Sequence, residues 1–531
     1  MRPWHVSSFE IFVIFYDSLA RDGWIPFMTS ITSVNRNTIS DVIRRSATRV
    51  PDKTAIVFDD RTWTYAELES AVTSVARHLV SQGLEKGDRV AAFDKNSDLF
   101  AILFLACTRA GLIHVPINYQ LTREELEYML ENSGAKRIYV GEEFIRHVQS
   151  AKADNVEVVP FAELVEVAQQ TDVEPSEPGE FDVVDTDVAQ LLYTSGTTSL
   201  PKGAIMTHRA LLTEYQSALL TLDQEESDRW IHALPLYHSA QMHVLLIPSL
   251  MKGSFNIIVP APVTGQLLEI IEREKITSFF AAPTVWVAIA HHPDLQTRDL
   301  SSLKRAMYGA SIMPGPILKQ LRETLPNLGF YNCMGQSELG PLAIVLRPEE
   351  HDERPDFAGR PVPFVETRLA DPEGNDVAPG EQGEILYRSP QLCLGYWNKP
   401  EATEEAFAGG WFHSGDLAVA DEQGYIKVVD RVKDVINTGG VLVAGRQVED
   451  SIFELDAVEE VAVVGQPDEK WIEAITAYVV VKEGKELDET TVIEHVKERL
   501  AAFKAPKAVH FVDALPKNSA GKILKRKLRE S

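Results

Sequence analysis

The stretch LLYTSGTTSLPKGAIMTH, residues 191–208, joins an apolar run to a polar turn that is rich in hydroxyl groups. Four hydroxyl side chains surround one glycine, and a lysine follows a proline: Thr194, Ser195, Gly196, Thr197, Thr198 and Lys202. Backbone N–H groups, hydroxyls and a lysine together can bind an anion, and phosphate is the expected ligand. The chain contains neither G-x-x-x-x-G-K-[ST] nor G-x-G-x-x-G, which disfavours a P-loop kinase or ATPase.

The bulk composition limits the class of protein. The chain has 531 residues, which is too long for one ordinary core and predicts two to four domains. The formal net charge of -26 argues against nucleic-acid partners and against binding to anionic membranes. Three cysteines lie far apart without a C-x-x-C pair, so we expect neither a disulfide framework nor a zinc site. A reducing, cytoplasmic location fits this cysteine usage.

Strand-like and helix-like segments alternate along the chain. TAIVFDD (54–60) and RTWTYAEL (61–68) read as a hairpin, and an amphipathic helix follows over 66–84. Thr122 and Glu125 form the capping box of a further helix. This rhythm predicts an α/β fold, in which mostly parallel sheets are covered by helices.

Changes in the pattern of strand, helix and turn signals along the chain suggest three parts. Residues 28–432 are predicted to form the large domain, with a turn-rich β subdomain at about 357–430, and residues 433–531 a small α+β domain. Residues 1–27 are interpreted as an extension or an over-long start. Their apolar run FEIFVIFY (9–16) is too short to span a bilayer, although a helix that binds a membrane surface or a partner stays an alternative.

Six motifs carry a resemblance to a known family. YTSGTTSLPKG (193–203) resembles the signature Y-T-S-G-T-T-G-x-P-K-G of the adenylate-forming superfamily. Further motifs follow in the family's order: YGAS (308–311), MGQSE (334–338), GWFHSGD (410–416), DRVKD (430–434) and PKNSAGKILKRKLR (516–529). The chain looks closest to fatty-acid–CoA ligases. The resemblance implies that ATP and a carboxylate form an acyl-adenylate and pyrophosphate, and that a thiol then attacks the adenylate.

The resemblance also assigns the nucleotide site. The hydroxyl turn and the catalytic lysine Lys202 would hold the ATP phosphates, and Glu338 with Thr194 would bind Mg²⁺, which favours oxygen ligands. Adenine and ribose would contact Gly309, Ala310, Ser337, Asp416 and Arg431. Two positions depart from the pattern: Ser199 replaces a glycine and is expected to tune rate or ATP affinity, and Met334 replaces an aromatic beside adenine.

Two successive reactions at one carbonyl carbon require a domain movement. The resemblance assigns Lys522 to the adenylation step, where it contacts the carboxylate and the α-phosphate. Lys433 matches the family hinge, and a plain linker lysine is the alternative. Gly439 and Gly440 would line the tunnel for the thiol.

HALPLYHSAQMHVLLIPSLMKG (232–253) resembles the helix that forms the acyl pocket in this family. His238 matches its motif and is a candidate catalytic residue, although a core histidine is the alternative, and His243 is left without a role. The expected lining is apolar: Tyr237, Met242, Phe280, Ala281 and Ala282. Such a pocket favours a medium- or long-chain fatty acid over an amino acid.

No carrier domain is recognised beside these motifs, which favours coenzyme A as the acceptor. An aryl or short sulfur-containing acid remains an alternative substrate, and a homodimer is possible. A protein that binds nucleotide without catalysis is a remote alternative, since Lys202, Glu338 and Lys522 are all present.

Overall fold

The computed structural model describes most of the chain after residue 34. The described residues are 35–151, 155–170, 173–177, 179–194, 200–309, 313–438, 441–468, 471–517 and 523–529. Several predicted features lie outside these ranges: Ser195, Gly196, Thr197, Thr198, Ser199, Ala310, Gly439, Gly440, Lys522 and the extension 1–27.

A six-stranded sheet carries the hydroxyl turn. Its strands lie in the order β6 (Glu157–Pro160), β5 (Arg137–Val140), β3 (Arg89–Phe93), β4 (Ile113–Pro116), β7 (Val188–Thr194) and β8 (Lys202–Thr207). Neighbours from β6 to β7 are parallel, whereas β7 and β8 form an antiparallel hairpin. The predicted phosphate turn therefore connects the two strands of that hairpin.

A nine-stranded sheet is the second large layer. Its order is β15 (Arg360–Pro361), β14 (Leu342–Leu346), β13 (Gly329–Gly335), β12 (Arg305–Gly309), β11 (Ser278–Phe280), β9 (Arg229–His232), β10 (Phe255–Ile258), β1 (Thr54–Phe58) and β2 (Arg61–Thr64). The strands from β13 to β1 are parallel, and the pairs at both ends are antiparallel. The hairpin predicted at residues 54–68 is the β1–β2 pair.

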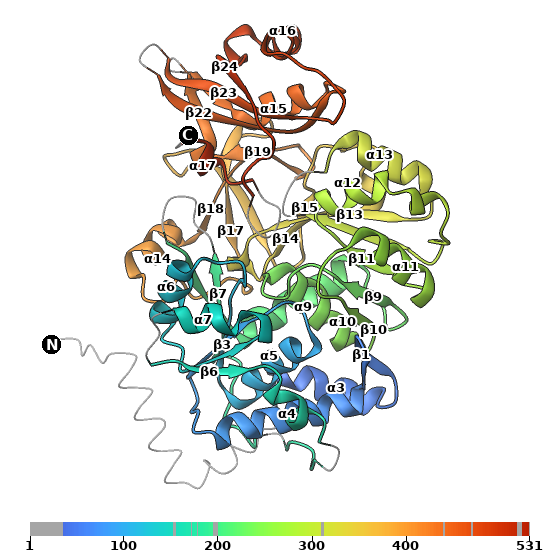
Figure 1. Cartoon of the computed structure of the whole chain (residues 1–531). Coiled ribbons are helices and arrows are strands. Elements are labelled where there is room, and N and C mark those ends of the chain that lie inside the picture. Colours follow the sequence, from blue (N-terminus) through green and yellow to red (C-terminus); the bar gives the residue numbers. More distant parts are fainter. Residues whose placement is uncertain are drawn as a thin grey trace, which may run out of the picture.

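Helices cover both sheets (Figure 1). They are α3 (Ser40–Arg49), α4 (Tyr65–Ser81), α5 (Asp98–Ala110), α6 (Arg123–Ser133), α7 (Ile145–Ser150), α8 (Glu163–Ala168), α9 (His208–Thr221), α10 (Ile247–Lys252), α11 (Thr264–Glu274), α12 (Pro283–His291) and α13 (Gly315–Thr324). Helix α5 is buried at every position, which explains why its sequence is apolar nearly all round. The predicted capping box of Thr122 and Glu125 opens α6.

Two smaller sheets complete the fold. The antiparallel four-stranded sheet contains β16 (Glu366–Ala370), β17 (Gln382–Arg388), β18 (Phe412–Ala420) and β19 (Ile426–Arg431), with α14 (Pro400–Ala406) nearby. The C-terminal sheet contains β20 (Val435–Thr438), β21 (Val441–Ala444), β22 (Val458–Asp468), β23 (Ile472–Val481) and β24 (Ala508–Phe511), with α15 (Gly445–Phe453), α16 (Glu489–Arg499) and α17 (Lys525–Arg529).

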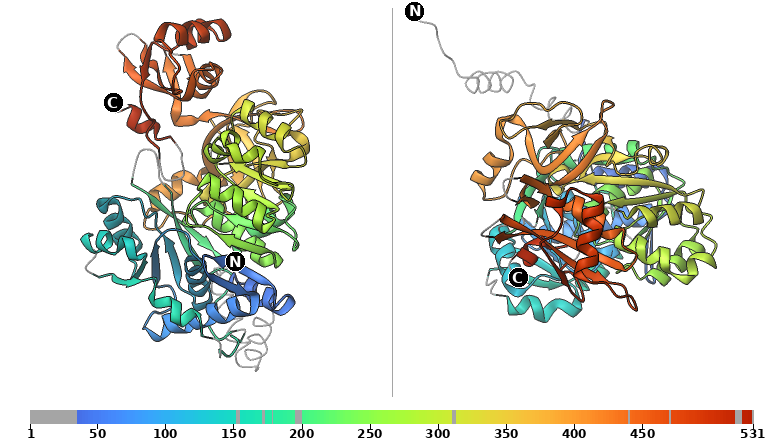
Figure 2. Two further views of the ribbon diagram at one scale, coloured as in Figure 1. Left: turned by 45° about the vertical axis from the view of Figure 1, so that its right-hand side comes forward. Right: turned by 90° about the horizontal axis from the view of Figure 1, so that it is seen from above.

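The smaller C-terminal unit lies at the opposite end of the molecule from α3 and α4, as Figure 1 and the left view of Figure 2 show. The predicted fold class, an α/β body with a small α+β unit, is confirmed. Within the described part of the chain, no helix has the length and apolar character that a membrane crossing requires.

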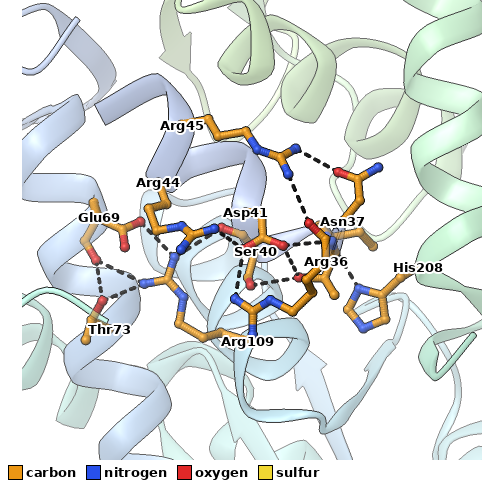
Figure 3. A network of polar contacts seen from close by, with 12 residues as sticks. Arg36, Asn37, Ser40, Asp41, Arg44, Arg45, Glu69, Thr73, Arg109 and His208 are labelled. Carbon is orange, nitrogen blue, oxygen red and sulfur yellow. Dashed lines mark hydrogen bonds and ion pairs between the residues drawn. The ribbon is translucent and has the colours of Figure 1, made fainter. Parts of the chain in front are cut away.

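A buried polar network fixes α3 against the body (Figure 3). Asp41 is fully buried and accepts hydrogen bonds from the Thr38 N–H at 2.9 Å, from Arg36 at 2.9 Å and from Arg44 at 2.7 Å. Burial works against ionisation, but these donors and charges hold the pKa of Asp41 below its ordinary value of 3.8.

Arg109 of α5 is the cation at the centre of the same network. It is 4% exposed and its guanidinium donates to Glu69 Oε2 of α4 at 2.7 Å and to the Ser40 carbonyl of α3 at 3.2 Å. It also donates to the Thr73 hydroxyl. One buried side chain therefore ties three helices together.

We expect Arg109→Met to destabilise the protein by about 3–5 kcal/mol, because it leaves a buried carboxylate at Glu69 without its cation. Urea-induced unfolding measures the change. The control is Arg273→Met, since Arg273 pairs with Glu269 while both side chains are more than half exposed; it should cost less than about 1 kcal/mol. Equal effects of the two substitutions would contradict this role for the network.

Candidate active site

The turn after β13 carries the carboxylate that the sequence singled out for metal binding. Glu338 lies in the short helical turn Ser337–Leu339 and is 8% exposed. Its Oε1 accepts hydrogen bonds from the Thr194 hydroxyl at 3.2 Å and from the Tyr396 hydroxyl at 2.9 Å. The structure thus brings Glu338 together with Thr194, from which it is separated by 144 positions in the sequence.

Tyr396 is a functional candidate that the sequence analysis missed. Besides holding Glu338, its ring lies 5.1 Å from the Lys202 ammonium, a cation–π distance. Burial and the neighbouring Glu338 raise the pKa of Tyr396, so its hydroxyl stays protonated and donates. Tyr396 lies outside the named strands, in an isolated β-bridge with Ala204, and the residue types around position 396 gave no chemical signal.

The donor set around Glu338 suits Mg²⁺. Among the described residues there is no group of three or more His, Cys, Asp or Glu side chains that could hold a metal by itself. A single carboxylate beside a hydroxyl fits Mg²⁺, which usually binds one or two carboxylates and completes its shell with waters and substrate phosphates. The residues therefore fit a metal that arrives with a polyphosphate.

The predicted ribose-binding pair is also brought together. Asp416 of β18 lies opposite Arg431 of β19, and the Arg431 Nε is 2.6 Å from Asp416 Oδ1. Gln336, which the sequence analysis did not select, donates from Nε2 to Asp416 Oδ2 at 2.8 Å and to the Ser414 carbonyl at 2.6 Å. Asp416 is therefore held on both oxygens, in an orientation set by the turn that bears Glu338.

A cavity of about 120 Å³ opens beside the same turn. The predicted residues His238, Phe280 and Ser337 line it, as do Met334 and Cys333. Ser337 and Ser239 lie within hydrogen-bonding distance, with their hydroxyl oxygens 2.9 Å apart. Most of the lining is apolar, and the remaining walls come from Ser239, Ala240, Val244, Leu245, Gly335, Gln336, Pro341 and Leu342.

Four residues predicted to line the acyl pocket do not line this cavity. Tyr237 and Met242 pack in the core around α4 and α5, and Ala281 packs in the core around α11 and α12. Ala282 is the residue immediately before α12. Of the five predicted positions, Phe280 alone is among the residues that line the described cavity.

Gly309 ends β12 beside Cys333 of β13. A Cβ at Gly309 would lie 2.2 Å from the Cys333 carbonyl oxygen, so only glycine permits this approach of the two strands. Cys333 and Met334 border the cavity, and Gly309 is therefore close to it.

Lys433 lies in the short turn Val432–Asp434, which connects the last strand of the four-stranded sheet to the first strand of the C-terminal sheet. Next to it, Asp434 forms an ion pair with Arg529 of α17. On the same helix, Lys525 lies 2.8 Å from Glu449 of α15. The end of the described chain is thus tied to the junction between the sheets.

Two models of one protein family match this chain. The model of the AMP-binding enzyme family matches residues 43–397, and the model of the AMP-binding enzyme C-terminal domain matches residues 447–522. The chain belongs to the AMP-binding enzyme family. The resemblance seen in its motifs is confirmed.

This AMP-binding enzyme is similar to several CoA ligases. It is 37% identical to a feruloyl-CoA synthase of Amycolatopsis sp. over 91% of this chain and 97% of the relative. It is 32% identical to a long-chain-fatty-acid–CoA ligase of Bacillus subtilis (strain 168) over 93% and 94%. The solved structure of the o-succinylbenzoate coenzyme A synthetase of Bacillus subtilis, in complex with ATP and magnesium ion, has a TM-score of 0.83 and 28% identity over 92% of this chain and 99% of that one.

In this AMP-binding enzyme we expect Tyr396→Phe to raise the Mg²⁺ concentration required for half-maximal activity by about 10–100-fold, the usual cost of losing a hydrogen bond to a ligating carboxylate. A Mg²⁺ titration of initial rates measures it. Tyr387→Phe is the control, because the buried Tyr387 hydroxyl has no hydrogen-bond partner among the described residues. Unchanged Mg²⁺ dependence in Tyr396→Phe would show that the hydroxyl does not position Glu338 for a metal.

Proposed function

We propose that this adenylate-forming enzyme is an ATP- and Mg²⁺-dependent acid–CoA ligase that activates a compact hydrophobic carboxylic acid, foremost an aromatic one. The observation that carries the choice of acid is the cavity of about 120 Å³ beside Glu338. An apolar cavity of about 150 Å³ holds one benzene ring. The described cavity is somewhat smaller than this, which favours a single ring over a long alkyl chain.

The lining supports the same choice. Phe280 and Met334 offer an aromatic ring and a thioether, both of which make favourable contacts with aromatic edges and faces. Ser239 and Ser337 place two hydroxyls on the wall, where a polar ring substituent can be bound. The similarity to a feruloyl-CoA synthase and to an o-succinylbenzoate coenzyme A synthetase, both named for aromatic acids, agrees with this assignment.

The residues divide the first half-reaction among them. A carboxylate oxygen of the acid forms a bond to the α-phosphorus of ATP, and the bond to pyrophosphate breaks. Lys202 and the hydroxyl turn bind the departing phosphates, and Asp416 with Arg431 binds the ribose diol. Mg²⁺ at Glu338 and Thr194 would neutralise phosphate charge when bound. These fixed charges are required because two anions must meet in a protein of net charge -26.

The second half-reaction transfers the acyl group. The sulfur of coenzyme A attacks the carbonyl carbon of the adenylate, the thiol proton is lost, and AMP leaves. We assign Lys522 to the first half-reaction, Lys433 to the hinge, and Gly439 and Gly440 to the thiol tunnel. A boundary at residue 433 is supported by the change of sheet between Arg431 and Val435.

A medium- or long-chain fatty acid is the second candidate substrate. It is favoured by the apolar wall of the cavity and by the similarity to a long-chain-fatty-acid–CoA ligase. A cytoplasmic location and a homodimer are part of the same proposal. The three cysteines, which are all free, support the reducing location.

A panel of acids tests the substrate. Benzoate, cinnamate, ferulate, 3-(methylthio)propanoate, octanoate and palmitate are each supplied with ATP, Mg²⁺ and coenzyme A, and pyrophosphate and thioester are both quantified. We expect at least one aromatic acid to exceed palmitate at least tenfold in kcat/KM. Preference for palmitate would establish the second candidate, and the absence of thioester from every acid would refute the ligase.

Lys522→Ala should separate the two half-reactions. Because the resemblance places this lysine at the carboxylate and the α-phosphate, we expect adenylate formation to fall by at least 100-fold, about the loss of one preorganised charge. Thioester formation from supplied acyl-adenylate should stay within about threefold. Lys527→Ala, a lysine of the neighbouring helix α17, is the control and should retain both steps. Equal loss of both half-reactions in Lys522→Ala would contradict the assignment.

A further inference from the structure

The segment that walls the cavity is a π-helix. It spans Ala240–Leu246 and continues directly into α10. The Ile247 N–H donates to the Met242 carbonyl, five residues back, as a π-helix requires. Such a long π stretch is rare, and π turns occur mostly where a function needs them. Something outside the segment must therefore favour this backbone over an α-helix.

His243 anchors the segment on one side. Its Nε2 lies 2.7 Å from the Gln190 Oε1 of β7, and its Nδ1 lies 3.0 Å from the Tyr215 hydroxyl of α9. Since an amide oxygen can only accept, Nε2 carries the proton and Nδ1 accepts from the tyrosine. His243 is fully buried and burial lowers its pKa to about 3, so the ring is neutral as this pattern demands.

Gln241 anchors the segment on the other side. Its Nε2 donates to His232 Nδ1 at 2.7 Å, and its Oε1 accepts from the Leu234 N–H at 3.2 Å. His232 ends β9 and its Nε2 lies 2.9 Å from Asn256 Oδ1 of β10. Gln241 is thus tied to the nine-stranded sheet and His243 to the six-stranded sheet. Both anchors are fully buried, so breaking either would leave unpaired polar groups in the core.

The π backbone decides which side chains reach the cavity. Ala240, Val244 and Leu245 all line it. In an α-helix of 3.6 residues per turn, positions 240 and 244 share a face, but position 245 points about 140° away. In a π-helix, whose hydrogen bonds join residues five apart, each turn takes more residues, so the fifth residue comes closer to that direction. Leu245 therefore faces the cavity because of the π backbone, and it packs with Phe280 and Leu342, whereas Leu246 packs in the core around α4 and α5.

We propose that Gln241 and His243 are positioning residues that hold this π backbone between the two sheets, and that Leu245 is consequently a specificity-determining residue that limits the size of the acid. The inference rests on the proposed function, because it takes the cavity to be the acyl pocket. It adds a reason why the pocket is small: Gln241 and His243 hold the backbone so that Leu245 points into the cavity.

Two neighbouring leucines provide a matched test. Leu245→Ala should raise kcat/KM for a bulky acid, 4-phenylbenzoate, relative to benzoate by at least tenfold, while KM for ATP stays within about twofold. Leu246→Ala removes the same atoms from the adjacent core position and should lower Tm while leaving that ratio within about twofold. A ratio unchanged in Leu245→Ala, or shifted equally in both variants, would overturn the proposal.

The anchors are tested separately. His243→Leu removes both hydrogen bonds and should shift the same ratio towards the bulky acid, and His243→Gln, which can restore one of them, should return part of the selectivity. If His243→Leu does not fold, Gln190→Leu breaks the same bond from the side of the sheet. Folded anchor variants with the selectivity of the parent would remove the positioning role.

The preference between the two acids is also measured by binding alone. For each acid, the rise in Tm is recorded without ATP or coenzyme A. The test therefore reports on Leu245 even if thioester formation fails. The absence of thioester in the parent protein counts against the proposed ligase. An unchanged binding preference in Leu245→Ala counts against the specificity role alone.

Discussion

The turn between β13 and β14 depends on a buried carboxyl that has no cation beside it among the described residues. Glu214 of α9 accepts from the Leu342 N–H at 3.2 Å and from Gln391 Nε2 at 2.6 Å. Gln391 also donates to the carbonyls of Leu339 and Leu342, at 3.1 and 3.0 Å. Burial raises the pKa of Glu214 well above its ordinary value of 4.5, so the group is held by hydrogen bonds alone. Gly340, at φ +92°, lets the turn bend over Glu214.

Several groups of the candidate site contact this turn or the cavity beside it. Glu338 accepts hydrogen bonds from Thr194 and Tyr396, Gln336 donates to Asp416, and Pro341 with Leu342 forms a wall of the cavity. This turn thus links Glu338, Asp416 and the cavity, the three places proposed to bind metal, ribose and the acid. The π-helical segment Ala240–Leu246 lines another side of the same cavity. Hydrogen bonds of Gln241 and His243 fasten this segment to the two large sheets. Two segments held by buried hydrogen bonds therefore line the cavity: the turn between β13 and β14, and the π-helical segment.

Sequence reasoning could select candidate site residues where they lie in short motifs. The hydroxyl turn, Glu338, Asp416 and Arg431 were each predicted from motifs, and the structure brings the described members into contact as pairs. Tyr396 and Gln336 were missed, because their roles depend on partners that are distant in the chain. The predicted acyl-pocket lining came from a resemblance to the family's pocket helix and named Met242, whereas Leu245 of the same segment lines the described cavity.

The sequence by itself determined the α/β architecture, the family and the residue types of the nucleotide site. These follow from periodic burial and from residues that lie close together in the chain, so local order is enough to recognise them. Only the tertiary structure decided which groups hold Glu338 and Asp416, and how large the acyl cavity is. Those properties arise from hydrogen bonds between elements as far apart as Gln190 and His243, which turn the helix backbone by a fraction of a turn. The pattern of residues along the sequence does not reveal this change from an α-helical to a π-helical backbone.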